Sequence, residues 1–196
     1  MVSSPVTIPE LLCAIERGEP LAFLFFWGHR PEPGGRVGRG CLSQWWPASF
    51  TVDGRVFATA EHYMMWRKAA LFCDEQVAGQ ILTAARPDRA KALGRQVRGF
   101  DQATWEAHRF GIVVDASTAK FGQNPELREY LLATDDKVLV EASPRDRVWG
   151  IGLAAGNERA QDPASWRGLN LLGFALMHAR SALGEGAAAG QAGGQR

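Results

Sequence analysis

The stretch EASPRDRVWGIGL, residues 141–153, carries the strongest signal for the fold of this chain. It follows a strand-like apolar run, residues 137–140, and it sets charged residues, a tryptophan and two glycines among apolar neighbours. A plain surface turn has no need of a tryptophan beside two glycines, and a core strand has no use for three successive charges, Arg145, Asp146 and Arg147. Both features suit the edge of a pocket, where backbone comes close to a ligand and charges face it. The alternative is a strand end whose charges are solvated.

A second segment, residues 58–69, reads as the start of a helix. Thr59 suits the N-cap, because its hydroxyl can accept a backbone N–H of the first turn. Glu61 and Lys68 then lie two helical turns apart and share one face, with apolar residues between them. The alternative is a half-buried helix whose Glu and Lys simply reach water.

The composition is that of an ordinary soluble globular protein. The chain has 196 residues, is 46% hydrophobic and carries a net charge of +1, which suits one domain and gives no electrostatic case for duplex DNA or a membrane surface. Three widely spaced cysteines without a Cys-x-x-Cys pair indicate reduced thiols and a cytoplasmic location, and the four histidines lack metal-ligand spacing. We see no signal peptide and no membrane-spanning run. The sequence says nothing of the oligomeric state.

Capping, proline and hairpin signals predict an α+β fold, a single domain that is predominantly helical with a small antiparallel β-sheet. The domain is expected to span residues 1–183, with an N-terminal helix at 8–17 and a core at about 21–183, followed by a low-complexity disordered tail at 184–196. Strands are predicted at 21–27, 42–46, 50–57 (a hairpin broken by Asp53-Gly54) and 137–142, and helices near 60–72, 74–84, 87–97, 101–113, 124–134 and 170–183.

Several common chemistries are not supported. The chain contains no Gly-x-Gly-x-x-Gly after a strand, no Walker loop and no Gly-x-Ser-x-Gly. Carboxylates, one helix lysine, tryptophans and arginines remain as the groups that could carry chemistry.

Motifs along most of the chain match those of a known family in order and spacing. They are residues 42–47 with Phe50, 53–54, 61–63 with 68–69, 94–95, 105–106, 120–124 with Leu127, 139–144 with Asp146, 149–153, and 168–173 with 176–177. On these motifs the chain resembles the NADAR family, also called YbiA-like, from about Leu21 to Leu183.

The resemblance implies an N-glycosidase that needs neither cofactor nor metal. One activity of the family is hydrolysis of the C–N bond in the phosphoribosylamino-pyrimidine intermediates of riboflavin biosynthesis, which disposes of reactive metabolites. Another branch removes ADP-ribose from guanine bases. The positions that matter in the family correspond here to Glu61, Lys68, Trp105 and Asp146.

These residue types suit the cleavage of a ribosyl C–N bond. Two tasks could be divided between Glu61 and Asp146. One is to stabilise the positive charge at the sugar carbon, and the other is to carry out the proton transfers. The Lys68 amine could instead attack an opened sugar and form a Schiff base. The base would stack on Trp46, Trp105 or Trp149, and Arg145 and Arg147 would hold the 5′-phosphate. We therefore expect Glu61, Lys68, Trp105 and Asp146 to converge on one cleft.

Each residue also has a structural alternative. Glu61 could complement its helix N-terminus, Lys68 could be only its ion-pair partner, the tryptophans could be core and the arginines solvated. The histidine after Glu61 is expected to be a hydrogen-bonded, partly buried residue rather than a catalyst.

The first motif departs from the family pattern in a way that bears on the substrate. Where the family commonly has Asn and an aromatic–Tyr pair, this chain has Gln44, Trp45 and Trp46, which predicts a reshaped base pocket. We favour a small phosphoribosyl substrate. The alternatives are a hydrolase that acts on ADP-ribosylated guanine in nucleic acid, and a module that binds ADP-ribose or NAD without catalysis.

Overall fold

Three helices begin where capping residues in the sequence predict. A computed structural model of the chain describes residues 5–192, and side chains as far as residue 186. Thr7, Thr59 and Asp101 occupy N-caps, and each side chain accepts a hydrogen bond from the backbone N–H three residues further on. These bonds satisfy N–H groups that a first helical turn leaves without intrahelical partners. The helices so capped are α1 (Ile8–Glu16), α2 (Ala60–Leu71) and α5 (Gln102–Gln123).

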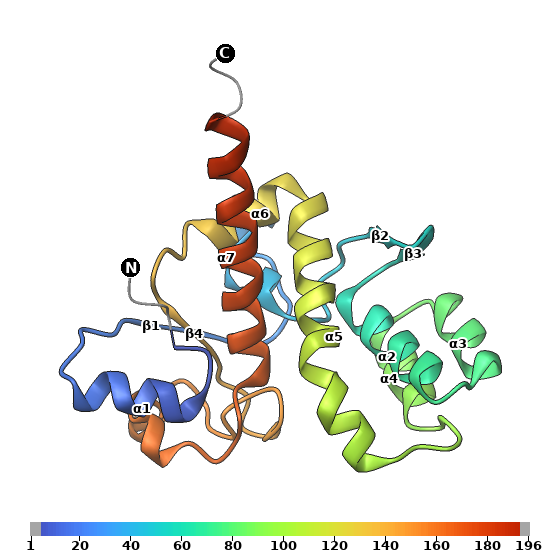
Figure 1. The fold of residues 1–196 in the computed structure, drawn as a ribbon, viewed down its shortest axis with the longest axis horizontal. Helices are drawn as coiled ribbons and strands as arrows, with labels where there is room; N and C mark the ends of the chain where they lie inside the picture. The colour runs from blue at the N-terminus through green and yellow to red at the C-terminus, as the bar shows by residue number, and fades with distance from the viewer. Residues whose placement is uncertain (1–4, 193–196) are drawn as a thin grey trace. The chain divides into compact units, whose positions relative to one another are not determined.

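The chain divides into two units (Figure 1). The first, which we call the helical unit, is Gln44–Pro125, and the second, the strand-pair unit, comprises the described residues up to Ser43 and from Glu126 onward. Besides α2 and α5, the helical unit holds β2 (Phe50–Val52), β3 (Arg55–Phe57), α3 (Glu75–Leu82) and α4 (Pro87–Gly94). The strand-pair unit holds α1, β1 (Phe23–Phe26), α6 (Pro125–Leu132, from its second residue), β4 (Val138–Glu141) and α7 (Leu171–Ala192), with 3₁₀ segments η1 (Pro33–Gly35), η2 (Arg39–Leu42), η3 (Glu158–Gln161) and η4 (Pro163–Ser165).

In the helical unit, α2 is the central element and contacts α3, α4 and α5. Its first half is buried on nearly every side, which explains why its sequence is apolar around much of the helix. Aromatic rings join it to the hairpin: the rings of Phe57 and Tyr63 meet edge to face with centroids 5.0 Å apart, and Trp66 lies 5.4 Å from Phe57. The helix that carries Glu61 and Lys68 is therefore fixed from several directions.

The predicted hairpin is present. β2 and β3 pair antiparallel, with Phe50 opposite Phe57. Asp53 and Gly54 join them with positive φ angles of 49° and 72°, as a two-residue turn that matches the strand twist requires. Gln123 at the end of α5 extends the hairpin, because its amide exchanges two hydrogen bonds of 2.8 Å with the backbone of Thr51.

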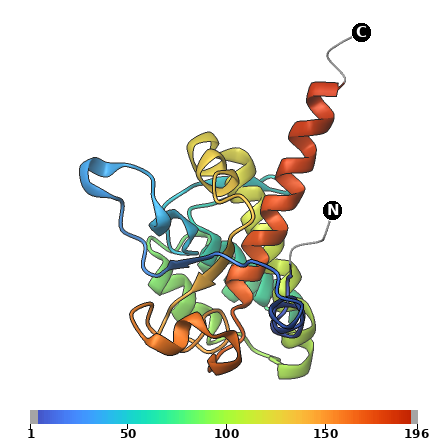
Figure 2. The ribbon, with the colours of Figure 1, turned by 90° about the vertical axis from the view of Figure 1, so that its left-hand side faces the viewer.

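In the strand-pair unit, β1 and β4 pair in parallel, with Phe23 opposite Val138 and Phe26 opposite Glu141 (Figure 2). Helix α7 packs against β4. The residues Val138, Leu139 and Val140 are almost fully buried, as strands covered on both faces are in parallel sheets. The unit therefore builds its core around β4.

Three predictions about the fold need correction. The strand predicted over 42–46 is absent: residues 39–42 form η2 and a turn follows, because the chain at Gln44 bonds to the start of α2 rather than to a strand. A parallel pair accompanies the predicted antiparallel sheet, since β1 and β4 are far apart in sequence and neither signals its partner. Helix α7 continues to Ala192, into the segment predicted to be disordered, which is rich in alanine, the best helix former. Residues 193–196 of that segment lie outside the described residues.

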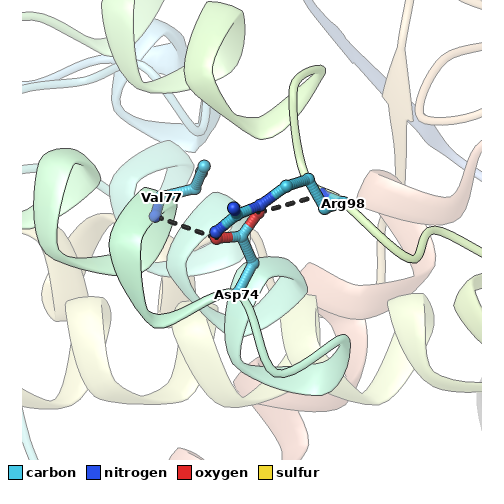
Figure 3. A network of polar contacts seen from close by, with 3 residues as sticks. All are labelled: Asp74, Val77 and Arg98. Atoms are coloured by element: carbon cyan, nitrogen blue, oxygen red, sulfur yellow. Dashed lines mark hydrogen bonds and ion pairs between the residues drawn. The ribbon is translucent and has the colours of Figure 1, made fainter.

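A buried carboxylate joins three segments of the helical unit (Figure 3). The side chain of Asp74 is 1% exposed and accepts hydrogen bonds from the backbone N–H of Val77 and from the backbone and guanidinium of Arg98. The hydrogen bonds from the Arg98 guanidinium hold the pKa of Asp74 well below its usual value. Because the folded state lowers this pKa, Asp74 contributes stability that is present above the unfolded pKa of about 4 and is lost as the pH falls below it.

We predict that Asp74→Asn lowers the melting temperature at pH 7. The amide keeps one acceptor but loses the charge that Arg98 binds. The difference from the unsubstituted protein should shrink between about pH 4 and pH 2, where the carboxylate itself becomes protonated on unfolding. Thermal unfolding followed by circular dichroism across this pH range measures both.

Asp88→Asn is the matched control. Asp88 pairs with Arg86 at 2.8 Å, and both side chains are exposed to solvent, so the pair contributes little. A melting difference for Asp74→Asn that stays constant down to pH 2 would show that the charge of Asp74 is not what stabilises the fold.

Candidate active site

The first turn of α2 fixes the position of Glu61. Thr59 caps the helix, and the backbone N–H of Glu61 donates to the carbonyl oxygen of Gln44 at 3.0 Å. The Glu61 residue is only 2% exposed. A carboxylate in a first helical turn is stabilised by the positive end of the helix dipole. The site thus holds an acid that bulk water hardly reaches, which is a setting typical of catalytic carboxylates.

His62 is hydrogen-bonded, as expected, and it is almost fully buried. Its Nε2 lies 3.0 Å from the Ala84 carbonyl oxygen, which can only accept, so this nitrogen carries the proton. Its Nδ1, 2.8 Å from the Thr59 hydroxyl, then accepts a hydrogen bond. Burial lowers the pKa of His62, so the ring is neutral at pH 7 and fastens the start of α2 to the end of α3.

The amine of Lys68 lies against two aromatic rings. Its Nζ is 4.1 Å from the ring centroid of Phe100 and 5.6 Å from that of Trp105. Burial lowers the pKa of Lys68, because an apolar setting disfavours the ammonium form. A lysine with a lowered pKa supplies more neutral amine near pH 7 than an ordinary lysine, and the neutral amine is the nucleophile in Schiff-base chemistry.

Gln44 brings a buried amide next to the Glu61 backbone. The residue is 6% exposed, and within the part of the chain that the structure describes its Oε1 has no hydrogen-bond partner. A buried acceptor without a protein donor is commonly satisfied by water or by a ligand. Trp46, two residues further on, is half-buried, so part of its ring remains accessible.

Asp146 holds its own turn together. Its Oδ1 accepts the backbone N–H groups of Val148 and Trp149, each at 2.8 Å, and its own N–H donates to the Ser143 hydroxyl at 3.2 Å. This is the pattern by which Asp side chains stabilise turns. Both backbone bonds use Oδ1, and the residue is half-buried, so the carboxylate is held in one orientation at the end of β4.

Gly150, and Gly168 beside it, allow the chain to pack closely against itself. A Cβ on Gly150 would lie 2.7 Å from the carbonyl oxygen of Glu141, and one on Gly168 would lie 2.2 Å from the carbonyl oxygen of Gly150. Backbone bonds such as Leu169 N–H to the Arg147 carbonyl oxygen at 3.0 Å join this stretch to residues 167–172. The expectation that these glycines admit a ligand is therefore wrong for Gly150, whose neighbour is the protein's own backbone.

The remaining predicted residues of this stretch are accessible. Arg145 and Arg147 are exposed, and Trp149 is half-buried. Trp105, in contrast, is 9% exposed, with its ring facing Lys68.

The structure places the predicted residues in two groups. Glu61, Lys68, Trp105 and Trp46 belong to the helical unit, where α2 carries the acid and the amine on one face and Trp105 lies beside the amine. Asp146, Arg145, Arg147 and Trp149 belong to the strand-pair unit. Convergence of all of these on one cleft stays a prediction.

Two residues beside the predicted ones were missed in the sequence. Phe100 covers the Lys68 amine, and Gln44 holds the Glu61 backbone. The only sequence signal for Phe100 is an aromatic residue in the short loop before the Asp101 cap, which is too common a pattern to single out. Gln44 was visible only as a departure from the family motif.

The described residues offer no obvious place for a metal ion or a membrane span. Within residues 5–192, no three His, Cys, Asp or Glu residues are grouped so that they could hold a metal ion. Over the same range, none of the helices combines the length and the apolar character needed to cross a bilayer.

The chain belongs to the NADAR family, since the sequence model of the NADAR domain matches residues 25–184. It is 40% identical over 163 residues to N-glycosidase R617 of Acanthamoeba polyphaga mimivirus, covering 81% of this chain and 94% of that protein. It is 34% identical over 138 residues to N-glycosidase YbiA of Escherichia coli (strain K12), covering 70% of this chain and 76% of that protein. The NMR structure of E. coli YbiA is similar with a TM-score of 0.67 at 27% identity, covering 86% of this chain and 90% of that one. The α+β, YbiA-like fold predicted from the sequence is thus confirmed.

Two substitutions of Asp146 distinguish its role in the turn from a role in the reaction. Asp146→Asn keeps an oxygen for the Val148 and Trp149 N–H groups, so we predict an unchanged unfolding free energy but a turnover reduced by ~10²-fold, the usual scale for a lost acid–base group. Asp146→Ala removes the one oxygen that accepts both hydrogen bonds and should also cost about 1 kcal/mol, as a lost helix cap does. Urea unfolding and substrate turnover measure the two effects.

Asp162→Ala is the control, because Asp162 Oδ1 likewise accepts a backbone N–H, that of Ala164, at 3.0 Å. It should lower stability without lowering turnover. Full turnover in Asp146→Asn would leave Asp146 with a structural role alone.

Proposed function

We propose that this chain is an N-glycosidase that hydrolyses the C–N bond of phosphoribosylamino-pyrimidine intermediates of riboflavin biosynthesis. The observation that carries the proposal concerns the Lys68 amine. Its pKa is lowered by burial, it lies beside Trp105, and it belongs to the same helix as the buried Glu61. The names of the NADAR relatives, N-glycosidase R617 and N-glycosidase YbiA, support the reaction class. The substrate is a small molecule.

The direct route needs two carboxylates and one water molecule. As the bond between C1′ and nitrogen breaks, positive charge develops on the sugar carbon, and a carboxylate beside it stabilises that charge. In the proposed roles Glu61 activates the water that adds to C1′, and Asp146 delivers the proton that the leaving nitrogen gains. The products are ribose 5-phosphate and the free pyrimidine amine.

The covalent route runs through Lys68. Its neutral amine adds to C1′ of the ring-opened sugar, the pyrimidine amine leaves with a proton, and a C=N bond to Nζ remains. Water then hydrolyses this imine, which releases ribose 5-phosphate and restores the amine. Burial of the Lys68 amine favours this route, because it keeps more of the amine neutral.

The other residues bind the substrate in this proposal. Trp46, Trp105 or Trp149 stacks on the flat pyrimidine, a contact worth ~1–3 kcal/mol per base. Arg145 and Arg147 are exposed and charged, as residues that capture a 5′-phosphate from solvent need to be. The buried Oε1 of Gln44 can accept a hydrogen bond from an amino group of the base.

We also propose a cytoplasmic location, on the ground that the three cysteines are widely spaced in the sequence and include no Cys-x-x-Cys pair. The runner-up substrate is ADP-ribosylated guanine. Turnover measured on both substrates under one condition decides between them.

We predict that Glu61→Gln folds normally and reduces turnover by at least ~10²-fold, because the amide keeps the shape but can neither stabilise charge nor accept a proton. Release of the pyrimidine product from the phosphoribosyl substrate is the measurement. Glu75→Gln is the matched control, since Glu75 also lies in a first helical turn, that of α3, but is exposed. Comparable losses of turnover in both variants would mean that Glu61 acts only by complementing the dipole of its helix.

We predict that borohydride traps the sugar on Lys68 and not on the Lys68→Ala variant. The yield of adduct should rise with pH through a midpoint below 10.5, since the reactive neutral amine forms as the pH passes the lowered pKa of Lys68. Intact-protein mass spectrometry after borohydride treatment reads the adduct.

Lys91→Ala is the control for this experiment. Its amine also lies near a tryptophan, 5.8 Å from the ring centroid of Trp45, but on α4. Absence of any adduct on the unsubstituted protein would limit Lys68 to an electrostatic or orienting role.

A further inference from the structure

A tight turn over residues 32–36 lies in the connection between β1 and η2. The Glu32 N–H donates to the Arg36 carbonyl oxygen at 3.0 Å, and the Gly35 N–H donates to the Glu32 carbonyl oxygen at 3.0 Å. Gly34 and Gly35 have φ angles of 80° and 77°, which residues with a Cβ rarely adopt. The backbone of this turn is therefore closed on itself, and Arg36 leaves it from a defined position.

Helix α6 presents a polar face to this turn. Glu126, Glu129, Tyr130 and Ala133 follow one another at spacings of three, four and seven residues, which places them on one side of a helix. The buried residues of the helix, Leu127 and Leu131, fix it to the core. The polar face is thus held in place by apolar packing that does not involve it.

A cavity of about 580 Å³ lies between the turn and this face of α6. That volume is within the usual range of small-molecule sites. The lining belongs wholly to the strand-pair unit and comprises Gly34, Gly35, Arg36, Val37, Glu126, Glu129, Tyr130 and Ala133.

The cavity is lined by charges of both signs that do not pair with one another. Arg36, Glu126 and Glu129 are exposed, and within the described residues none of the three takes part in an ion pair. Two carboxylates and one guanidinium give the lining a net charge of −1. A ligand that complements it carries two cationic groups and one anionic group.

Tyr130 adds an aromatic surface beside the two carboxylates. Its side chain is half-buried, and burial raises the pKa of its hydroxyl, so the phenol is neutral at pH 7 and leaves the charge of the lining unchanged. A guanidinium or ammonium group binds favourably over the face of such a ring.

We propose that this cavity binds a free dibasic amino acid such as L-arginine. The α-ammonium and the side-chain cation of the ligand each bind one of Glu126 and Glu129, whose Cβ atoms are about 5–6 Å apart at this helical spacing. The α-carboxylate binds Arg36, and the side-chain cation lies against the ring of Tyr130. This site goes beyond the proposed glycosidase activity and does not depend on it.

Isothermal titration of the full chain with L-arginine, agmatine and L-citrulline tests the site. Agmatine lacks the α-carboxylate, and citrulline replaces the guanidinium by a neutral urea of similar shape. Each should bind about tenfold or more weakly than arginine, the scale of one lost charge-assisted contact. Binding of arginine should also weaken as salt increases, since the charges are exposed.

Variants assign each contact to its residue. Glu126→Gln and Glu129→Gln should each weaken arginine binding by about tenfold. In Arg36→Gln the preference for arginine over agmatine should disappear, because the partner of the α-carboxylate is gone. Tyr130→Leu should weaken arginine binding, whereas Tyr130→Phe, which keeps the ring, should not.

Glu158→Gln is the matched control. Glu158 is an exposed glutamate of the same unit and also lies in a first helical turn, that of η3, but it does not line this cavity. Its loss should leave the Kd for arginine unchanged.

Three results would overturn the proposal. They are the absence of arginine binding at millimolar concentration, equal effects of Glu126→Gln and Glu158→Gln, and agmatine binding as tightly as arginine to the unsubstituted protein. The last two would reduce the site to general attraction of cations. Because binding is measured without turnover, loss of the glycosidase activity and loss of this site are separate outcomes.

Discussion

The carboxylate of Asp74 is the interaction on which the surroundings of Lys68 depend. It caps α3 through the Val77 N–H, and the backbone N–H of the same aspartate donates to the Ala69 carbonyl oxygen near the end of α2. On its other side it holds the backbone and guanidinium of Arg98 (Figure 3). Arg98 lies two residues before Phe100, the ring nearest to the Lys68 amine. An ion pair between this buried carboxylate and a largely exposed guanidinium thus places the ring that covers the proposed nucleophile.

Asn170 joins segments of the strand-pair unit, as Asp74 does in the helical unit. It is fully buried, with a positive φ of 53°, a conformation that asparagine tolerates better than most residues. Its Oδ1 accepts the Glu141 N–H and its Nδ2 donates to the Leu139 carbonyl oxygen, both at 2.9 Å. An aspartate at this position could not make the second bond. One amide therefore completes the free edge of β4 and sets the point from which the Asp146 turn begins.

The parts of this fold that the sequence predicts are those with local causes. Thr7, Thr59 and Asp101 cap helices, Pro87 opens α4, and Asp53-Gly54 closes the hairpin, because each acts on backbone within a few residues. The parallel pairing of β1 with β4 depends on segments far apart in the chain, and neither strand specifies its partner. The strand predicted at residues 42–46 failed for the same reason, since the carbonyl of Gln44 bonds to the distant α2.

The candidate site was predictable to a similar degree. A helix face shared by Glu61 and Lys68 follows from their spacing alone, whereas the approach of Trp105 to Lys68 requires α5 to cross α2, which no local pattern reveals. The glycines at 150 and 168 were visible in the sequence, but their purpose was not. Each is needed because backbone passes within van der Waals distance, a fact that only the folded chain shows.

Asp146 shows how the chain can hold a proposed catalytic group rigidly without a separate support. The same Oδ1 that a carboxylate would offer to a substrate already binds the Val148 and Trp149 N–H groups, so rotating the side chain breaks two hydrogen bonds and opens the turn. Backbone hydrogen bonds also fix this turn to residues 167–172. The orientation of the acid is therefore set before any ligand arrives, and such preorganisation is the condition under which a charged group contributes most to a transition state.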